Sequence, residues 1–393
     1  MTSRERVMTT LRHQEPDRIP FDLGSTGSTG INADTYVKLR KLLGLAGREP
    51  VLRDIKQHLA LVQEDVLDRL EVDARGVQRK SGSSYHFELK EDADSHYYTD
   101  EWGITYKKPK AGGLYFDIVR SPLADARTVA DVENHPWPDP VDEQRIGSSV
   151  AEAERVARET DCCLVVGCMM AGLLEMGCWL RGFETFYMDL AMGSAVGEAI
   201  LDKLTELKLA YWAALLPRLG ENADVLRQGD DYGGQNGLLV SPETYRKYFF
   251  PSYRTIFEFL KKTAQKEVFT FLHSCGSVRE LIPDFIECGV DILNPVQVAA
   301  ANMDTKELKR EFGRDISFWG GGIDTQHVLP HGSAQEVGDE VRRRIDDLAP
   351  GGGFVFATVH NIQGDVPPEN ILTMWKTYCD RRNYKDTPSF TMT

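Results

Sequence analysis

Residues 268–296 read VFTFLHSCGSVRELIPDFIECGVDILNPV, and this stretch indicates the fold class. Val268–His273 is an apolar run of strand length, Val278–Cys288 has the apolar spacing of a helix, and Val290–Val296 is a second apolar run. Two apolar strands joined through a helix by short loops are typical of parallel strands whose faces are covered by helices. The stretch therefore predicts one βαβ unit of an α/β fold.

The same alternation extends on both sides of this unit. Further strand-like runs lie at Cys163–Met169, Asp224–Gln228, Ile316–Trp319 and Phe354–Val359. Helices are predicted between them at Glu184–Leu204, Pro242–Thr263 and Gln335–Leu348. With early strands at Ile19 and Glu71–Val77 the chain has eight strands, which favours a closed (β/α)8 TIM barrel over an open doubly wound sheet. The sequence contains neither the Gly-rich dinucleotide fingerprint nor a P-loop.

Residues 84–119 have a different texture from the rest of the chain. SYHFELK, HYYTDEWGITYKK and LYFDIVRSPL are aromatic, alternate in polarity and are separated by polar or Gly-containing turns. Such segments are typical of an antiparallel meander. We therefore expect a single barrel domain over residues 1–393 with an antiparallel β-hairpin insertion at 84–119. The chain should open with a helix at residues 3–13 that has Ser3 as its N-cap.

Charge and cysteine content exclude several classes of protein. The 46 Lys and Arg residues against 60 Asp and Glu give a net charge of −14, which has the wrong sign for a nucleic-acid-binding surface. The N-terminus lacks the apolar segment of a secretory signal, and the apolar stretch Cys162–Leu180 is interrupted by Glu175 and three glycines. We interpret that stretch as a buried strand and helix, not a membrane span. The seven cysteines of a chain without a signal are expected to be reduced thiols in the cytoplasm.

His273 and Cys275 are the first candidates for a metal site. Side chains alternate along a strand, so these two residues project to the same side at the end of their strand. His360 follows the last predicted strand, and the site of a barrel of this kind lies at the C-terminal ends of its strands. A lone His or Cys at such a position is often only a core residue, but the three together favour a metal. Three protein ligands with one open position is the layout of catalytic zinc.

A second cluster follows the strand Asp224–Gln228. Asp230 and Asp231 lie in a Gly-rich loop, where a carboxylate can bind a substrate hydroxyl, act as acid or base, or orient a metal-bound histidine. A turn capped by Asp is the alternative.

Four other residues are also candidates for the site. Gln235 and Asp324 are further binding candidates, and Cys168 is the one other thiol placed at the site end of a strand. Glu175 is a carboxylate in an apolar segment, where it is either a metal ligand, a group supporting a ligand or part of an ordinary salt bridge.

Five stretches of the sequence resemble the uroporphyrinogen decarboxylase superfamily. They are SRERVMTTLRHQEPDRIPFDLG (3–24), DEWGITYKK (100–108), QGDDYGGQNGLLVSPETYRKYFFP (228–251), FLHSCGSVRELIPDFIECGVDILNPVQ (271–297) and GGGFVFATVHNIQGDVPPENI (351–371). The resemblance implies a (β/α)8 barrel, in agreement with the strand pattern. It also implies one of two activities, because the family contains decarboxylases and zinc-dependent, corrinoid-linked methyltransferases.

Two motifs separate these branches. The decarboxylases carry an R-Q-A-G-R motif after the first strand, where this chain has GSTGSTG at residues 24–30. The methyltransferase branch carries the H-x-C pair that stands here as His273 and Cys275. In its thiol-methylating members the third zinc ligand is a cysteine a few residues before P-x-E-N, whereas this chain has His360 before Pro367–Asn370. Replacing that thiolate by an imidazole lowers the negative charge on the metal and suits an oxygen leaving group.

The resemblance implies a methyltransferase that takes a methyl group from a small methylated donor, such as an aryl methyl ether, and passes it to the cobalt(I) of a corrinoid (cobalamin). The corrinoid is expected on a separate protein, because the chain lacks a D-x-H-x-x-G motif. Zn²⁺ or a nearby acid, Asp230 or Tyr232, would stabilise the leaving oxygen. The apolar walls for the donor are expected from Met169, Trp179 and Trp319.

Three alternatives remain open at this point. They are a methylcobamide:thiol methyltransferase, a decarboxylase of the uroporphyrinogen type and a non-catalytic binding partner of a corrinoid protein. Self-association into an oligomer is also open.

Overall fold

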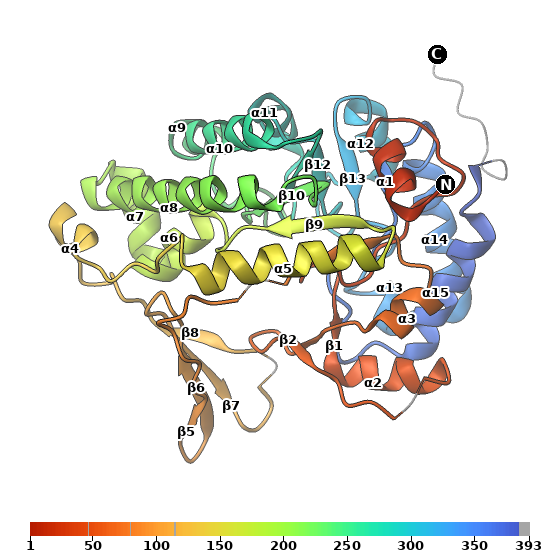
Figure 1. The fold of residues 1–393 in the computed structure, drawn as a ribbon, viewed down its shortest axis with the longest axis horizontal. Coiled ribbons are helices and arrows are strands. Elements are labelled where there is room, and N and C mark those ends of the chain that lie inside the picture. Colours follow the sequence, from red (N-terminus) through yellow and green to blue (C-terminus); the bar gives the residue numbers. More distant parts are fainter. Residues whose placement is uncertain (46, 79, 114, 385–393) are drawn as a thin grey trace.

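A curled sheet of seven parallel strands surrounded by helices forms the centre of the protein (Figure 1). The structure is a computed structural model that describes residues 1–45, 47–78, 80–113 and 115–384; positions 46, 79, 114 and 385–393 lie outside this description. The strands are, in spatial order, β14 (Phe354–Val355), β13 (Ser317–Trp319), β12 (Ile292–Asn294), β11 (Phe269–His273), β10 (Val225–Gly229), β9 (Cys163–Gly167) and β4 (Ala74–Gly76). The predicted α/β class is confirmed.

The eighth predicted strand, at Ile19, does not form as a regular strand. Instead, Phe21 makes an isolated parallel bridge to Phe356 beside β14. At the other edge of the sheet, the Asp73 amide donates to the Phe21 carbonyl at 2.8 Å, next to β4. Pro20 has no N–H to donate, so the segment cannot extend a ladder in both directions. A short extended segment therefore connects the two edges of the curled sheet.

The outer helices differ from the prediction mainly in where they break. The segment predicted as one helix at Glu184–Leu204 is α7 (Phe183–Met192) followed by α8 (Ala195–Leu219), and Gly193 between them has a φ of 66°. Pro242–Thr263 divides at Phe249 into α9 (Pro242–Tyr248) and α10 (Phe250–Thr263), with Pro251 in the first turn of α10.

The remaining elements include α5 (Glu143–Glu159), α11 (Ile282–Cys288), α12 (Thr305–Phe312), α14 (Ala334–Leu348) and α15 (Pro368–Arg381). The apolar stretch Cys162–Leu180 is β9 followed by α6 (Leu173–Arg181), as predicted. Over the described residues, no helix combines the length and apolarity needed to cross a lipid bilayer.

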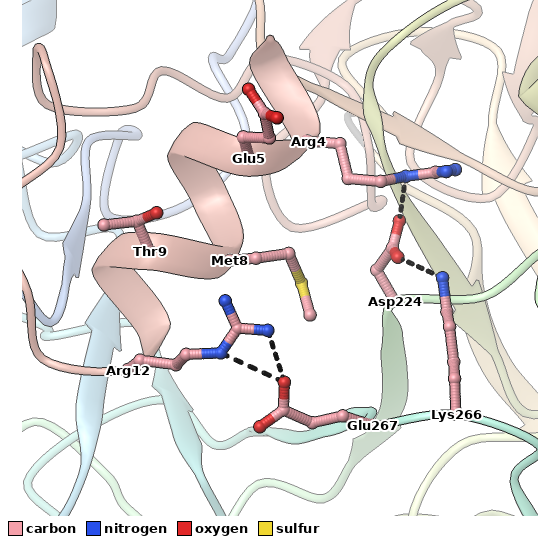
Figure 2. Close-up of a pocket in the computed structure, with 8 residues that line it drawn as sticks. All are labelled: Arg4, Glu5, Met8, Thr9, Arg12, Asp224, Lys266 and Glu267. Atoms are coloured by element: carbon pink, nitrogen blue, oxygen red, sulfur yellow. Dashed lines mark hydrogen bonds and ion pairs between the residues drawn. The ribbon is translucent and has the colours of Figure 1, made fainter. Parts of the chain in front are cut away.

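Helix α1 (Ser3–Leu11) covers the N-terminal end of the strands. Its N-cap is Thr2, not the predicted Ser3, because Thr2 and Glu5 form a reciprocal capping box. Val7 and Leu11 pack with the inward-facing residues of the strands. Figure 2 shows the charged side of this contact, where Arg4 and Lys266 both donate to the Asp224 carboxylate, at 3.0 and 2.6 Å. This end of the sheet is thereby closed by packing and ion pairs.

A four-stranded antiparallel sheet lies outside the main sheet (Figure 1). It consists of β5 (Lys90–Glu91), β6 (Ser95–Thr99), β7 (Thr105–Pro109) and β8 (Asp117–Arg120). The predicted range, 84–119, includes Leu114, which lies outside the described residues. Tyr98, Tyr106 and Phe116 are buried against each other on one face, with ring centroids 5.1 Å apart for both neighbouring pairs.

A second, three-stranded sheet connects this part to the main sheet. It contains β1 (Ile31–Asn32), β3 (Leu59–Ala60) and β2 (Leu52–Asp54). In sequence, α2 (Ala33–Leu42) lies between β1 and β2, and α3 (Glu64–Arg69) follows β3. The turn between β2 and β3 reaches the antiparallel sheet, since the Phe116 amide donates to the Lys56 carbonyl at 3.3 Å.

Candidate metal centre

The structure brings His273, Cys275 and His360 together at the C-terminal end of the main sheet. One ligating atom from each residue lies within 4.8 Å of the others. His273 is the last residue of β11, and His360 follows β14, which is three strands away in the sheet. The curl of the sheet is what closes this distance, because a flat sheet would separate such strands by about 14 Å. The three side chains predicted as ligands therefore form one group.

Asn294 fixes the orientation of the His273 ring. Nδ1 of His273 lies 2.6 Å from Oδ1 of Asn294, and Nδ2 of Asn294 donates to the Trp319 carbonyl at 2.6 Å. The second bond requires the amide NH₂ to face Trp319, so Oδ1 must face the histidine and Nδ1 must carry the proton. Nε2 is left with its lone pair, and it lies 3.4 Å from Sγ of Cys275.

The protonation of the three residues suits a divalent metal. Burial lowers the pKa of His273 to about 4, with the Asp231 carboxylate acting in the opposite direction, and burial also lowers the pKa of His360. Both imidazoles are therefore neutral near neutral pH. Burial, followed by the charges of Asp231 and Glu175, raises the pKa of the Cys275 thiol, which favours a thiolate only when a cation is bound. Two neutral imidazoles and one thiolate are a donor set that fits zinc.

Asp231 lies against two of these residues. Its Oδ1 accepts the backbone N–H of Cys275 at 2.8 Å and lies 3.7 Å from Nε2 of His273. The side chain is 34% exposed. Asp231 thus positions the Cys275 backbone while keeping carboxylate surface available to a ligand.

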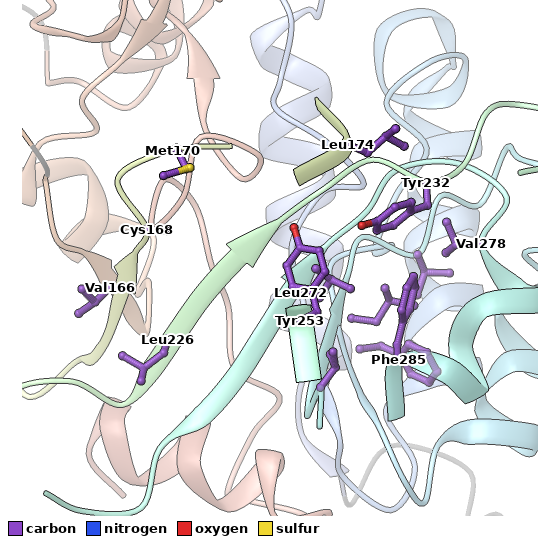
Figure 3. Packing of buried hydrophobic residues seen from close by; sticks show 14 of the residues in the cluster. Val166, Cys168, Met170, Leu174, Leu226, Tyr232, Tyr253, Leu272, Val278 and Phe285 are labelled. Atoms are coloured by element: carbon purple, nitrogen blue, oxygen red, sulfur yellow. The ribbon is translucent and has the colours of Figure 1, made fainter. Parts of the chain in front are cut away.

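Asp230 and Tyr232 occupy a different place from the one expected. Asp230 is fully buried and accepts four hydrogen bonds: from the amides of Leu174 (2.9 Å) and Glu175 (3.0 Å) and the hydroxyls of Tyr232 (2.6 Å) and Tyr253 (3.0 Å). Figure 3 shows the two tyrosines within the apolar packing around Phe285 and Val278. With both carboxylate oxygens occupied and the phenol buried, the pair anchors the first turn of α6. That Asp230 or Tyr232 protonates a leaving group stays a prediction, and these contacts favour a structural role for the pair.

Glu175 lies in the first turn of α6, beside the acidic side of the centre. Burial, and then the charges of Asp231 and Asp230, raise the pKa of Glu175 to about 8, while the nearby Lys56 opposes the shift. The Glu175 carboxyl consequently holds a proton at neutral pH. Trp179 lies one helical turn further along α6, and its ring is covered by the Lys56 ammonium at 3.8 Å from the ring centroid.

Two predicted wall residues are not available to a ligand. Met169 is 2% exposed and Trp319 is fully buried. The Trp319 ring lies inside the curled sheet, where Nε1 donates to Oδ2 of Asp22 at 2.9 Å and the ring packs edge-on against Phe271. The Trp319 carbonyl accepts from Asn294, which in turn holds His273, and the buried Trp319 ring leaves no exposed surface in this structure for the predicted substrate contact.

Three other candidates are held by local structure. Gln235 donates to the Ala299 carbonyl, and the Asp324 carboxylate accepts from the Gln326 amide at 2.7 Å and pairs with His327. Cys168 is buried and lies 3.9 Å from the Lys208 ammonium, outside the metal group. Each of the three side chains thus has a partner within the protein, and their binding roles stay predictions.

The sequence interpretation missed Asn294 and Arg227. Arg227 lies on β10, where its guanidinium donates to Ser28 at 3.1 Å and its charge lowers the pKa of Cys275. The two-residue period of a strand would have found both residues. Arg227 lies two residues after the inward-facing Val225 on β10 and therefore projects to the same side, and Asn294 pairs in register with His273.

The amino-acid sequence matches one family of known proteins and resembles individual members of it. The model of the family Uroporphyrinogen decarboxylase (URO-D) matches residues 109–380. The chain is 24% identical over 271 residues to a uroporphyrinogen decarboxylase of Trichlorobacter lovleyi, covering 67% of this chain and 74% of that protein. It is 27% identical over 233 residues to the methylcobamide:CoM methyltransferase MtaA of Methanosarcina barkeri, covering 58% of this chain and 61% of the relative. The chain thus spans about three fifths of that methyltransferase.

A solved structure shares the fold over nearly the whole chain. A methyltransferase from Methanosarcina mazei superposes with a TM-score of 0.64 at 18% sequence identity, covering 97% of this chain and 99% of the other. At this coverage the likeness extends into residues 1–108, which the matched family region does not include.

Proposed function

The chain belongs to the uroporphyrinogen decarboxylase family, and we propose that within it this protein is a zinc-dependent methyltransferase. It moves a methyl group from a small donor to the cobalt(I) of a corrinoid carried on a separate protein. The observation that carries the proposal is the group of His273, Cys275 and His360, whose ligating atoms lie within 4.8 Å of one another. Relatives of the chain include methylcobamide methyltransferases as well as decarboxylases.

The three residues would hold one zinc ion at the end of the sheet. Zinc would supply a Lewis acid that stabilises negative charge developing on a donor atom. Asn294 holds the His273 ring so that Nε2 faces the group, and Asp231 holds the backbone of Cys275. A ligand set with two neutral imidazoles and one thiolate carries less negative charge than one with two thiolates, which favours an oxygen leaving group.

An aryl methyl ether fits these groups as the donor. When its methyl–oxygen bond breaks, the electron pair stays on the oxygen, which needs a proton or a cation to become a good leaving group. Glu175 supplies such a proton, because its pKa of about 8 keeps the carboxyl protonated near neutral pH. The leaving phenol takes the proton and Glu175 becomes a carboxylate beside Lys56.

The decisive assay follows the cobalt spectrum. Zinc-loaded protein is mixed with cob(I)alamin and a panel of methoxyarenes, and the absorbance change that accompanies methylation of the cobalt is recorded. We expect methylation with the wild-type protein and loss of methylation in His273→Ala, which removes a ligand. Turnover only of methylcobalamin with a thiol acceptor would overturn the ether assignment.

The reverse reaction is the second candidate. The relative MtaA is a methylcobamide:CoM methyltransferase, and thiolate sulfur is an ordinary ligand of zinc, so the same centre could hold a thiolate acceptor. The same assay run with methylcobalamin and simple thiols tests it. A decarboxylase is less well supported, because the loop at residues 24–30 reads GSTGSTG and contains no arginine for a polycarboxylate. A protein that purifies without stoichiometric zinc would favour a non-catalytic role.

A further inference from the structure

Lys56 connects α6 with the antiparallel sheet through its side chain and its backbone. It lies in the turn between β2 and β3, and its Nζ is 3.8 Å from the ring centroid of Trp179 on α6 and 4.5 Å from that of Tyr106 on β7. Its carbonyl accepts the Phe116 amide at 3.3 Å. The ammonium is thus clamped between two aromatic rings from two different parts of the protein.

We propose that Lys56 is a positioning residue, which acts on the metal centre through Glu175 and makes the antiparallel sheet part of the active site. The inference rests on the proposed function and deepens it. Glu175 and Trp179 are four residues apart on α6 and so lie on the same face of the helix. A cation held over Trp179 is therefore held beside Glu175 as well.

The surroundings of Lys56 explain why a cation is needed there. Burial lowers the pKa of Lys56, and the carboxylates of Glu175, Asp54 and Asp100 oppose that shift. The rings of Trp179 and Tyr106 attract a cation through their π-faces, which offsets part of its lost hydration. Three acidic side chains act on the charge of this one ammonium, and two aromatic faces contact it. A neutral side chain at position 56 would remove the positive charge that opposes proton binding by Glu175.

Hydrogen bonds within the antiparallel sheet fix the position of Asp100, one of the acidic groups near the Lys56 ammonium. Asp100, in the turn between β6 and β7, accepts the amides of Trp102 at 2.9 Å and Ile104 at 3.0 Å. Burial raises the pKa of Asp100 to about 6, while these bonds and Lys56 oppose the rise. The sheet therefore presents a rigid carboxylate and the Tyr106 ring to the ammonium.

A set of ionisable groups lies between Lys56 and the metal ligands. Several ionisable groups interact electrostatically with Glu175. They are Lys56 in the β2–β3 turn, Asp230 and Asp231 in the loop after β10, Cys275 in the loop after β11, and Cys178 on the same helix as Glu175. Asp231 in turn contacts Cys275 and His273. Within this set Lys56 is the cation that limits how tightly Glu175 binds its proton, because the other groups are neutral or negative.

The test uses Lys56→Met, Lys56→Arg, Glu175→Gln and the double variant Lys56→Met/Glu175→Gln. Lys107→Met is the matched control, since Lys107 lies next to Tyr106 on β7 and pairs with Asp92 on the exposed side. Infrared spectroscopy reads the C=O stretch of the protonated Glu175 carboxyl, identified as the band that Glu175→Gln removes. This readout needs no turnover.

We expect Lys56→Met to move the titration of that band upward by about one pH unit, since a nearby opposite charge lowers a carboxyl pKa by roughly 1–3 units and this variant removes it. Lys56→Arg should keep the wild-type titration, and so should Lys107→Met. In the cobalt assay, the losses from Lys56→Met and Glu175→Gln should not add in the double variant. Should Lys56→Met disturb the fold, Tyr106→Leu keeps the ammonium but loosens its clamp, and a smaller upward shift is expected.

An unchanged titration in folded Lys56→Met, or fully additive losses in the double variant, would overturn the proposal. A protein that methylates no cobalt from any donor yet keeps the infrared response to Lys56→Met would refute the proposed function and leave the coupling of Lys56 to Glu175 standing. The two failures are therefore distinguishable.

Discussion

Nδ1 of His273 donates to Oδ1 of Asn294 over 2.6 Å, and this contact decides which ring nitrogen can bind a metal. Asn294→Ala removes the acceptor, so the ring loses its fixed tautomer and orientation. We expect zinc affinity to fall about 10-fold or more, as is typical when the partner of a ligating histidine is lost. Competition with a chromophoric chelator measures the affinity. Asn294→Asp keeps an acceptor oxygen and is the control; equal affinities in wild type and Asn294→Ala would contradict this role.

The protons released by zinc binding report the resting state of the ligands. Both histidines are neutral because burial lowers their pKa values, to about 4 for His273, whereas the raised pKa of Cys275 keeps its thiol protonated. In Glu175→Gln, which removes the other proton held nearby, zinc binding should release about one proton. Calorimetry in buffers of different ionisation enthalpy gives the count, and a release of two or more protons would show that the histidines are charged.

Glu175 should make the stability of the zinc-free protein depend on pH. Its pKa is about 8 in the folded chain, raised from 4.5, so between these values the folded state binds a proton that the unfolded state does not. The free energy of unfolding therefore falls as pH rises through this window and levels off above it. Glu175→Gln removes that slope. Allowing for the partial exposure of the side chain, we expect the variant to be more stable than wild type by on the order of 2 kcal/mol above the window and nearly equal below it.

Urea unfolding of both proteins across the window measures this difference. If the free energy of unfolding depends on pH in the same way in wild type and Glu175→Gln, the Glu175 carboxyl is ionised in the folded protein. It would also withdraw Glu175 as the proton donor.

The variant Tyr232→Phe tests whether the Tyr232 hydroxyl has a structural or a catalytic role. Asp230 keeps its bonds from Leu174, Glu175 and Tyr253 in this variant, so we expect a stability loss of about 1–2 kcal/mol and little change in methylation rate per folded molecule. Thermal unfolding and the cobalt assay measure the two effects. A rate loss of orders of magnitude in stable, folded Tyr232→Phe would restore the phenol as an acid.

Strand positions and the three metal-ligand candidates were predictable because apolar runs and the two-residue period depend on local sequence. Phe269–His273 is a strand, and His273 lies at its site end. The break between α7 and α8 was missed at Gly193, where a single left-handed residue redirects an otherwise continuous helical pattern. The strand expected at Ile19 failed for a similar local reason, since Pro20 interrupts the donors of the ladder.

The supporting groups were harder to predict because they depend on contacts between distant segments. Asp230 and Asp231 are neighbours in one loop, yet one is saturated by α6 and Tyr253 and the other faces the metal group. Nothing in an adjacent Asp pair indicates which carboxylate turns inward. Lys56 is separated from Glu175 by more than a hundred residues, and only the folded chain places its ammonium over Trp179.

The central claim is that His273, Cys275 and His360 bind one zinc ion, and X-ray absorption at the zinc edge tests it most directly. For the zinc-loaded protein the account predicts one sulfur neighbour at about 2.3 Å and two imidazole nitrogens at about 2.0 Å, with the remaining position filled by a light atom. Cys275→Ser should remove the sulfur contribution and leave the imidazole signal. A zinc environment without sulfur in the wild-type protein, or one unchanged by Cys275→Ser, would contradict the account.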